Sequence, residues 1–202
     1  MARIQPIPDH EARLSVRLTY WFTRRALRNA SGRNPARMIE PLQVYAHNPE
    51  LLSGYAKLEQ ATAALSALSS RVRALAELRA ATVVGCEYCI DMGSQISRRW
   101  GLADEEIVAL PHYLDSDLFS VPEKLVLEYA TAMSRTPVTV TDQLFDALRQ
   151  HFNDKQLLEL THVIALENLR ARFNLAIGIT AAGFSEGAVC ALPDTDPPTG
   201  PH

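Results

Sequence analysis

The sequence predicts an all-α protein, and three observations support this fold class. The chain of 202 residues contains only 9 glycines and few alternating runs of β-branched residues, which argues against a large sheet. Apolar residues recur instead at the spacing of an α-helix. Helix start and stop signals follow one another along the chain and predict about seven or eight helices.

The first three clear helices lie in the middle of the chain. Asn48-Pro49-Glu50 combines an N-cap residue, a proline at the first helical position and an early acid, so we expect a helix that reaches about Ser69. A second helix is expected from Arg71 to Val84, where the apolar residues have helical spacing. A third is expected from Cys86 to Trp100, where Gly101 closes it.

Four more helices are predicted by capping signals in the second half of the chain. A polar or acidic residue precedes each of them. The signals are Asp104, Ser120-Val121-Pro122-Glu123, Thr141-Asp142 and Asn153-Asp154-Lys155-Gln156. The corresponding helices are expected to cover residues 104–110, 124–134, 141–152 and 153–179.

Residues 1–44 are expected to form an N-terminal helical extension. Four arginines fall within an arc of roughly 60° on a helix. They are Arg13, Arg17, Arg24 and Arg28. A basic helix at a membrane surface is one interpretation. A surface helix with a basic, solvated face is favoured, because Val16, Tyr20 and Leu27 interrupt a clean apolar face.

The rest of the chain divides into a helical domain and a tail. Residues 45–185 are expected to form one domain, and no internal repeat is evident in it. Residues 186–202 are proline-rich, with four of the 12 prolines after residue 191. We expect disorder from Leu192 to His202.

Composition excludes several classes of function. A net charge of -3 and a pI of about 6.1 give no global electrostatic case for nucleic acid binding. No apolar run approaches the roughly 18 residues of a membrane span, and the first residues lack the apolar segment of a signal peptide. Three cysteines do not make a secreted disulfide scaffold. We therefore expect a cytoplasmic enzyme with no membrane partner.

The most informative motif is Cys86-Glu87-Tyr88-Cys89, preceded by Gly85. On a helix, Cα atoms three residues apart lie roughly 5 Å from each other, within the roughly 4.4–6.8 Å that a disulfide accepts. A thiol at a helix N-terminus also lies at the positive end of the helix dipole, which favours the thiolate. The pair can therefore cycle between dithiol and disulfide with little backbone movement.

The cysteine pair has three other interpretations. A zinc site needs about four ligands, and the chain has no second CxxC and no close histidine pair. A c-type haem site needs a histidine after the second cysteine, where Ile90 stands. Inert buried thiols remain an alternative, but they are less common at this spacing. Redox chemistry is the favoured interpretation, and Cys190 is interpreted as an incidental small apolar residue.

The stretch from Glu77 to Met92 resembles the alkylhydroperoxidase D-like (AhpD-like) proteins of the carboxymuconolactone decarboxylase superfamily. Supporting matches are His47-Asn48-Pro49, residues 141–160, and residues 168–178, so that the resemblance covers roughly residues 45–185. The resemblance implies an AhpD-like helical bundle, a homo-oligomer, and thiol-dependent reduction of peroxides. It also implies that Cys89 attacks the peroxide and that Cys86 resolves the product.

Two positions depart from the pattern of the better-known members of this superfamily. Those proteins have a histidine four residues after the second cysteine, where this chain has Gly93. They have a glutamate about twelve residues before the first cysteine, where this chain has Ala74. These two residues relay protons to and from the thiol. Glu77, one helical turn further along, is the candidate replacement, although a surface or salt-bridged acid is the alternative.

Two further side chains are candidates for substrate binding. The hydroxyl group of Tyr88, between the cysteines, can donate a hydrogen bond to a peroxide oxygen, although a packing role is favoured. His162 lies among leucines on the long C-terminal helix, and a core histidine is favoured over a catalytic one.

The leading hypothesis is a thiol oxidoreductase that reduces hydroperoxides without a metal or organic cofactor. A dithiol protein, either dihydrolipoyl or thioredoxin-like, is the expected reductant. Two alternatives stay open. One is a decarboxylase-like enzyme that acts on a lactone acid, and the other is a non-catalytic, redox-sensing oligomer. Thiol titration with and without peroxide separates them, because only the first hypothesis predicts the loss of two thiols.

Overall fold

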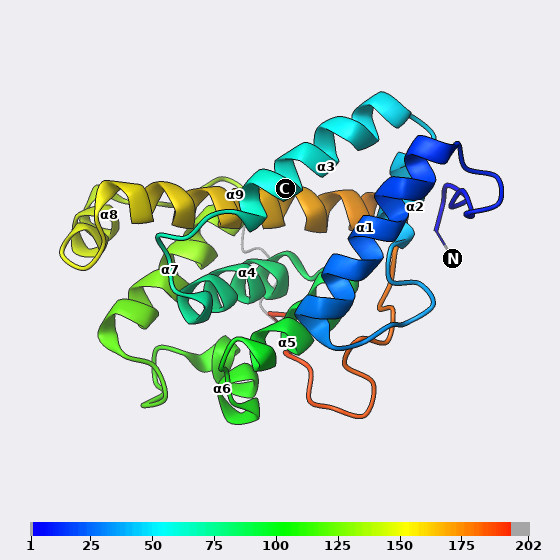
Figure 1. Ribbon diagram of the computed structural model, residues 1–202. Helices are drawn as coiled ribbons and strands as arrows, with labels where there is room; N and C mark the ends of the chain where they lie inside the picture. The colour runs from blue at the N-terminus through cyan, green and yellow to red at the C-terminus, as the bar shows by residue number, and fades with distance from the viewer. Residues whose placement is uncertain (1, 195–202) are drawn as a thin grey trace.

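The computed structural model describes residues 2–194 and is all-α over that range, as the sequence predicts (Figure 1). It contains nine α-helices and one short 3-10 turn, Leu110–His112, within these residues. The α-helices are α1 Leu14–Ser31, α2 Glu40–Tyr45, α3 Pro49–Ala63, α4 Ser70–Val84, α5 Glu87–Arg99, α6 Asp104–Ala109, α7 Val121–Ser134, α8 Asp142–Arg149 and α9 Asp154–Ile177.

Three of the predicted capping residues begin their helices for the expected reason, whereas Asp104 is the first residue of α6 and Ala103 is its N-cap. The Asn48 side chain accepts a hydrogen bond from the backbone N–H of Leu51 at the start of α3. Thr141 begins α8 in the same way, and Asn153 begins α9. Each of these side chains satisfies a backbone donor that has no partner within the helix.

Several predicted helix bounds were wrong, including the start of α7, which begins at Val121 rather than at Lys124. Helix α3 ends at Ala63 rather than near Ser69, because Ser69 is the N-cap of α4 and its side chain accepts from the N–H of Val72. Helix α8 ends at Arg149 rather than at residue 152. Cys86 is not the first helical residue of α5 but its N-cap, with an extended backbone at φ -82° and ψ 101°.

Helix α4 lies at the centre of the bundle. It packs against α5, α7 and α9, and Figure 1 shows it between α9 and α5. Alanines on α4 leave room for these neighbours on both sides. Ala76 and Ala80 belong to a hydrophobic cluster with α7, α8 and α9, whereas Ala74 and Ala81 belong to a cluster with α1 and α5.

The N-terminal region packs into the same hydrophobic cluster as α5. Val16 and Tyr20 of α1 are buried there, which explains why these apolar residues interrupt the basic face. The opposite side of α1 exposes Trp21 and Phe22, with 55% and 62% of their surfaces accessible. The division of the chain at residues 44 and 185 stays a prediction.

Residues 192–194 are ordered, contrary to the expectation of disorder from Leu192. Asp194 accepts two hydrogen bonds, of 2.7 and 2.9 Å, from the guanidinium of the buried Arg79. Its backbone N–H also donates to the carbonyl of Thr82. Residues 195–202 of the predicted tail lie outside the described range. Among residues 2–194, no helix combines the length and apolar character that crossing a membrane requires.

Candidate active site: a buried cysteine pair

The structure brings the sulfurs of Cys86 and Cys89 together, as their spacing predicts. The two Sγ atoms lie 2.6 Å apart, and both residues are free cysteines. Gly85 turns the chain out of α4 with a left-handed φ of 77°, and Cys86 then begins α5. From this N-cap position the Cys86 sulfur accepts a hydrogen bond of 3.3 Å from the backbone N–H of Cys89. The residues are buried, with exposed fractions of 0% and 3%.

Helix α9 covers the pair and contributes an amide. The side-chain nitrogen of Asn174 lies 3.8 Å from the Cys86 sulfur and 3.5 Å from the Cys89 sulfur. Asn174 is itself buried, and its side-chain oxygen has no hydrogen-bond partner among residues 2–194. The amide can therefore donate to negative charge on either sulfur.

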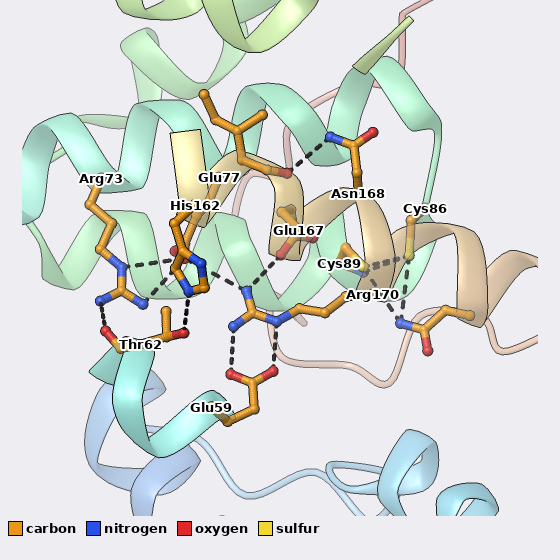
Figure 2. Close-up of polar contacts among 12 residues, drawn as sticks. Glu59, Thr62, Arg73, Glu77, Cys86, Cys89, His162, Glu167, Asn168 and Arg170 are labelled. Carbon is orange, nitrogen blue, oxygen red and sulfur yellow. Dashed lines mark hydrogen bonds and ion pairs between the residues drawn. The ribbon is translucent and has the colours of Figure 1, made fainter. Parts of the chain in front are cut away.

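A buried glutamate lies on the other side of Cys89. Glu167, two turns before Asn174 on α9, is 5% exposed, and its negative charge raises the pKa of the Cys89 thiol. Figure 2 shows Glu167 between Cys89 and Arg170. Arg170 donates to the Glu167 carboxylate at 2.9 Å. Sequence reasoning missed this acid, although Glu167, Arg170 and Asn174 have the i, i+3, i+7 spacing of one helix face.

Arg170 connects this glutamate to a wider buried network (Figure 2). Its guanidinium holds Glu59 of α3 with two hydrogen bonds, of 2.8 and 2.6 Å. Its other nitrogen lies 3.6 Å from Glu77 of α4, which also pairs with Arg73 at 3.2 Å. Three carboxylates thus share the charge of one arginine, and Arg73 supplies the second positive charge.

Burial sets the protonation of Glu167. Removal of its carboxyl group from water raises its pKa from 4.5 to about 7. The positive charge of Arg170 opposes this shift, and the negative charge of Glu77 adds to it. Glu167 is therefore close to half ionised at neutral pH.

The pKa values of the two thiols shift in opposite directions because the thiols share a hydrogen bond. The hydrogen bond with Cys89 lowers the pKa of Cys86, and the Cys89 N–H and the Asn174 amide lower it further. The same bond raises the pKa of Cys89 well above its ordinary value, as do burial and the nearby Glu167 carboxylate. The first proton to leave the pair therefore leaves its negative charge on Cys86.

The other predicted site residues have partners other than the two sulfurs. Glu77 pairs with arginines and makes no hydrogen bond to either cysteine. The Tyr88 hydroxyl donates to the carbonyl of Met38, and its ring packs edge-on against Phe184. His162 contacts the Thr62 hydroxyl at 2.7 Å through its Nε2 atom. The packing role favoured for Tyr88 agrees with its contacts.

The two positions that depart from the superfamily pattern are closely packed. A Cβ atom at Gly93 would lie 3.2 Å from the Cδ1 atom of Leu78, so a side chain at this position requires Leu78 to shift by a few tenths of an ångström. Ala74 is buried within α4. In place of the usual pair, the protein has a different acid next to Cys89 (Figure 2).

Asp91 anchors the segment that follows α9 onto α5. Its carboxylate accepts hydrogen bonds of 2.7–3.0 Å from four successive backbone N–H groups, those of Ala182, Gly183, Phe184 and Ser185. A cavity of about 400 Å³ lies along this segment, lined in part by Gly85, Ile90 and Cys190. Neither Cys86 nor Cys89 lines it, so this cavity does not lead to the sulfurs.

Comparison with known proteins identifies the family. Residues 49–132, from α3 into α7, match the Carboxymuconolactone decarboxylase family. The Escherichia coli (strain K12) protein YnjA, which is uncharacterized, is 42% identical over 130 residues, or 64% of this chain and 68% of YnjA.

Solved structures show the same fold. The debrominase Bmp8 in its apo form aligns with a TM-score of 0.77 at 19% identity, over 90% of this chain and 92% of Bmp8. An alkylhydroperoxidase AhpD core protein from Ralstonia eutropha JMP134, described as peroxidase-related, aligns with a TM-score of 0.69 at 19% identity, over 89% and 92% of the two chains. The present chain therefore belongs to the carboxymuconolactone decarboxylase family and has the AhpD-like helical fold.

Proposed function

We propose that this protein reduces hydroperoxides with the Cys86–Cys89 pair and is regenerated by a dithiol reductant. The observation that carries the proposal is the position of the two free thiols, whose sulfurs lie 2.6 Å apart beneath the Asn174 amide. Two thiols in this arrangement pass from sulfenic acid to disulfide without a large change of backbone.

The reaction consumes one hydroperoxide and two thiol protons. The Cys89 sulfur attacks the distal oxygen of ROOH, so that an S–O bond forms, the O–O bond breaks and the alkoxide leaves as ROH with the thiol proton. The Cys86 sulfur then attacks the sulfenic acid at Cys89, the S–O bond breaks and water leaves with the second proton. An external dithiol exchanges with the resulting disulfide and is itself oxidised.

Burial of the pair limits the substrate. With exposed fractions of 0% and 3%, the two cysteines are almost completely removed from solvent. The neutral amide of Asn174 and the carboxyl group of Glu167 lie beside them. A small or slender uncharged hydroperoxide is therefore favoured over a bulky or anionic one.

Single-turnover experiments on the reduced protein test this proposal. We expect hydrogen peroxide or an organic hydroperoxide to remove two thiols per chain, and mass spectrometry to locate one disulfide between residues 86 and 89. Cys89→Ser should consume no peroxide, whereas Cys86→Ser should complete one attack and stop as a sulfenic acid that dimedone traps. Serine retains an N-cap side chain at residue 86, so the start of α5 survives.

Cys190→Ser is the matched control, because Cys190 lies beside Ser94 rather than beside the pair, and its variant should react like the wild type. A wild-type protein that loses no thiols to peroxide would refute the proposal. If instead Cys86→Ser is inert and Cys89→Ser yields the trapped sulfenic acid, the roles of the two cysteines are reversed.

A further inference from the structure

The electrostatics of the pair leave one step unexplained. Attack by Cys89 requires loss of its proton, yet the helix N-terminus, the Cys89 N–H and the Asn174 amide stabilise negative charge on Cys86 instead. The two residues that relay protons in the better-known members of the superfamily are replaced by Ala74 and Gly93. A different group must accept the proton of Cys89.

We propose that Glu167 accepts the proton of the Cys89 thiol as its sulfur attacks and then donates that proton to the departing alkoxide. The proposal rests on the proposed function for its second half, the return of the proton to a peroxide oxygen. Its first half depends only on the position of the Glu167 carboxyl group beside Cys89, where both residues are buried (Figure 2).

The position of Glu167 suits this task. The carboxyl group is buried with Cys89 and comes from α9, not from α4 or α5, so it occupies neither of the two usual relay positions. Arg170 binds the carboxylate from the side away from the thiol and fixes its orientation (Figure 2). Arg170 therefore orients the carboxylate beside the thiol whose proton it is to receive.

The surrounding charges keep Glu167 able to exchange a proton at neutral pH. Arg170 is divided between Glu167, Glu59 and Glu77, so it does not hold Glu167 permanently ionised. Arg73 of α4, Tyr55 of α3 and Tyr45 of α2 also face this network, and the two thiols at the start of α5 face it from the other side. A base whose pKa lies near the working pH is the most effective proton carrier, and that of Glu167 is about 7.

The proton balance closes within the site. The carboxylate of Glu167 takes the Cys89 proton while the sulfur forms its bond to the distal peroxide oxygen. The O–O bond breaks, the alkoxide receives the proton from the Glu167 carboxyl group, and ROH leaves. Glu167 returns to its ionised form, ready for the next proton.

The decisive variant is Glu167→Gln, because two interpretations of this residue predict opposite results. If Glu167 only places negative charge beside Cys89, its neutralisation lowers the pKa of the thiol and speeds the reaction at pH 7. If Glu167 is the proton acceptor, the single-turnover rate with hydrogen peroxide at pH 7 falls by about 100-fold or more, as for loss of a general base. We expect this fall in rate, together with loss of the inflection near pH 7 when the rate is plotted against pH.

Two further variants separate this effect from disturbed folding. Glu167→Asp retains the acid but moves it one methylene away from the thiol, so we expect a slower reaction with the inflection preserved. Glu159→Gln is the matched control, because Glu159 is an equally buried acid on the same helix that binds the N–H groups of Ala67 and Leu68 instead. It should leave the rate and the pH profile unchanged.

Alkylation of Cys89 by iodoacetamide, located by peptide mass spectrometry, gives a readout that needs no peroxide. Slower alkylation at pH 7 in Glu167→Gln supports the proton acceptor, even if the wild type proves unable to reduce hydroperoxides and the proposed function fails. If the wild type reduces hydroperoxides and Glu167→Gln reacts as fast or faster with both reagents, the function stands and the role of Glu167 is overturned.

Discussion

Arg170 donates a hydrogen bond of 2.9 Å to Glu167, one helical turn before it on α9. The same guanidinium binds Glu59 with two hydrogen bonds and lies 3.6 Å from Glu77. One arginine therefore pairs with three acids. At Glu167 the effect of burial on the pKa exceeds the opposing effect of the arginine's positive charge, so the pKa rises to about 7.

This balance predicts a pH dependence of stability. The folded state raises the pKa of Glu167 above its ordinary value of 4.5, so it favours the neutral acid. The resulting stabilisation is complete below about pH 4.5 and is lost as the pH rises through about 7, with a size on the order of 3 kcal/mol. In urea unfolding between pH 5 and 8, Glu167→Gln should show a flatter decline than the wild type. Glu159→Gln should keep the wild-type decline, and an equally steep decline in Glu167→Gln would contradict the assignment.

Glu77 is expected to change the pKa of Glu167 rather than to contact the thiol. Its negative charge raises the pKa of Glu167, so Glu77→Gln should lower that pKa and move the inflection in Cys89 alkylation to lower pH. The exposed Glu50 on α3 offers the control, since Glu50→Gln should not move the inflection. A larger loss of rate in Glu77→Gln than in Glu167→Gln would instead make Glu77 the principal acid.

Asp91 should be among the most sensitive positions for stability. Asp91→Ala leaves four backbone N–H groups without their acceptor, and we expect a loss of about 3–5 kcal/mol in the free energy of unfolding. Asp91→Asn should lose less, because its amide retains one oxygen. Urea denaturation measures both, and Asp146→Ala, at an exposed site on α8, should change stability by no more than about 0.5 kcal/mol. A loss that small at Asp91 would show that the anchor is dispensable.

We also propose a homo-oligomer in which α1 contributes to the subunit contact. Trp21 and Phe22 pack edge-on with ring centroids 4.8 Å apart and lie exposed on α1. Burying them in a partner surface would stabilise assembly by about 25 cal/mol per Å² of apolar area. Light scattering of the wild type should give a multiple of 22.4 kDa, and Trp21→Ala/Phe22→Ala should lower it.

Point variants at Trp21 and Phe22 are preferred to deletion of α1, because Val16 and Tyr20 of the same helix belong to the core. Leu158→Ala, at an exposed site on α9, is the control. A wild-type mass near 22.4 kDa would refute assembly, and a loss of mass in Leu158→Ala alone would place the contact on α9.

Most helices of this protein were predictable because their signals are local. Asn48 and Asn153 mark the starts of α3 and α9, because each side chain accepts a hydrogen bond from the backbone N–H three residues later. Helix ends depend on the neighbouring helices, so the end of α3 at Ala63 was not predictable from its own residues.

The site was predictable only in part, for the same reason. The CxxC spacing brings Cys86 and Cys89 together within a single helical turn, whereas Glu167 reaches Cys89 from a helix that begins at residue 154. An acid within a helix is usually solvated, and nothing local shows that this one is buried. Glu77 was the more conspicuous candidate because it lies close to the cysteines in sequence, but its partners are arginines.

The anchor at Asp91 has a consequence for synthesis of the chain. Asp91 is held by N–H groups 91–94 positions later in the sequence, and the Asn174 amide lies 85 positions after Cys89. Since translation proceeds from the N-terminus, both cysteines leave the ribosome well before the segments that cover them exist. During that interval the thiols are open to any oxidant or disulfide they meet, and they gain their protected surroundings only when α9 has been made and has folded over them.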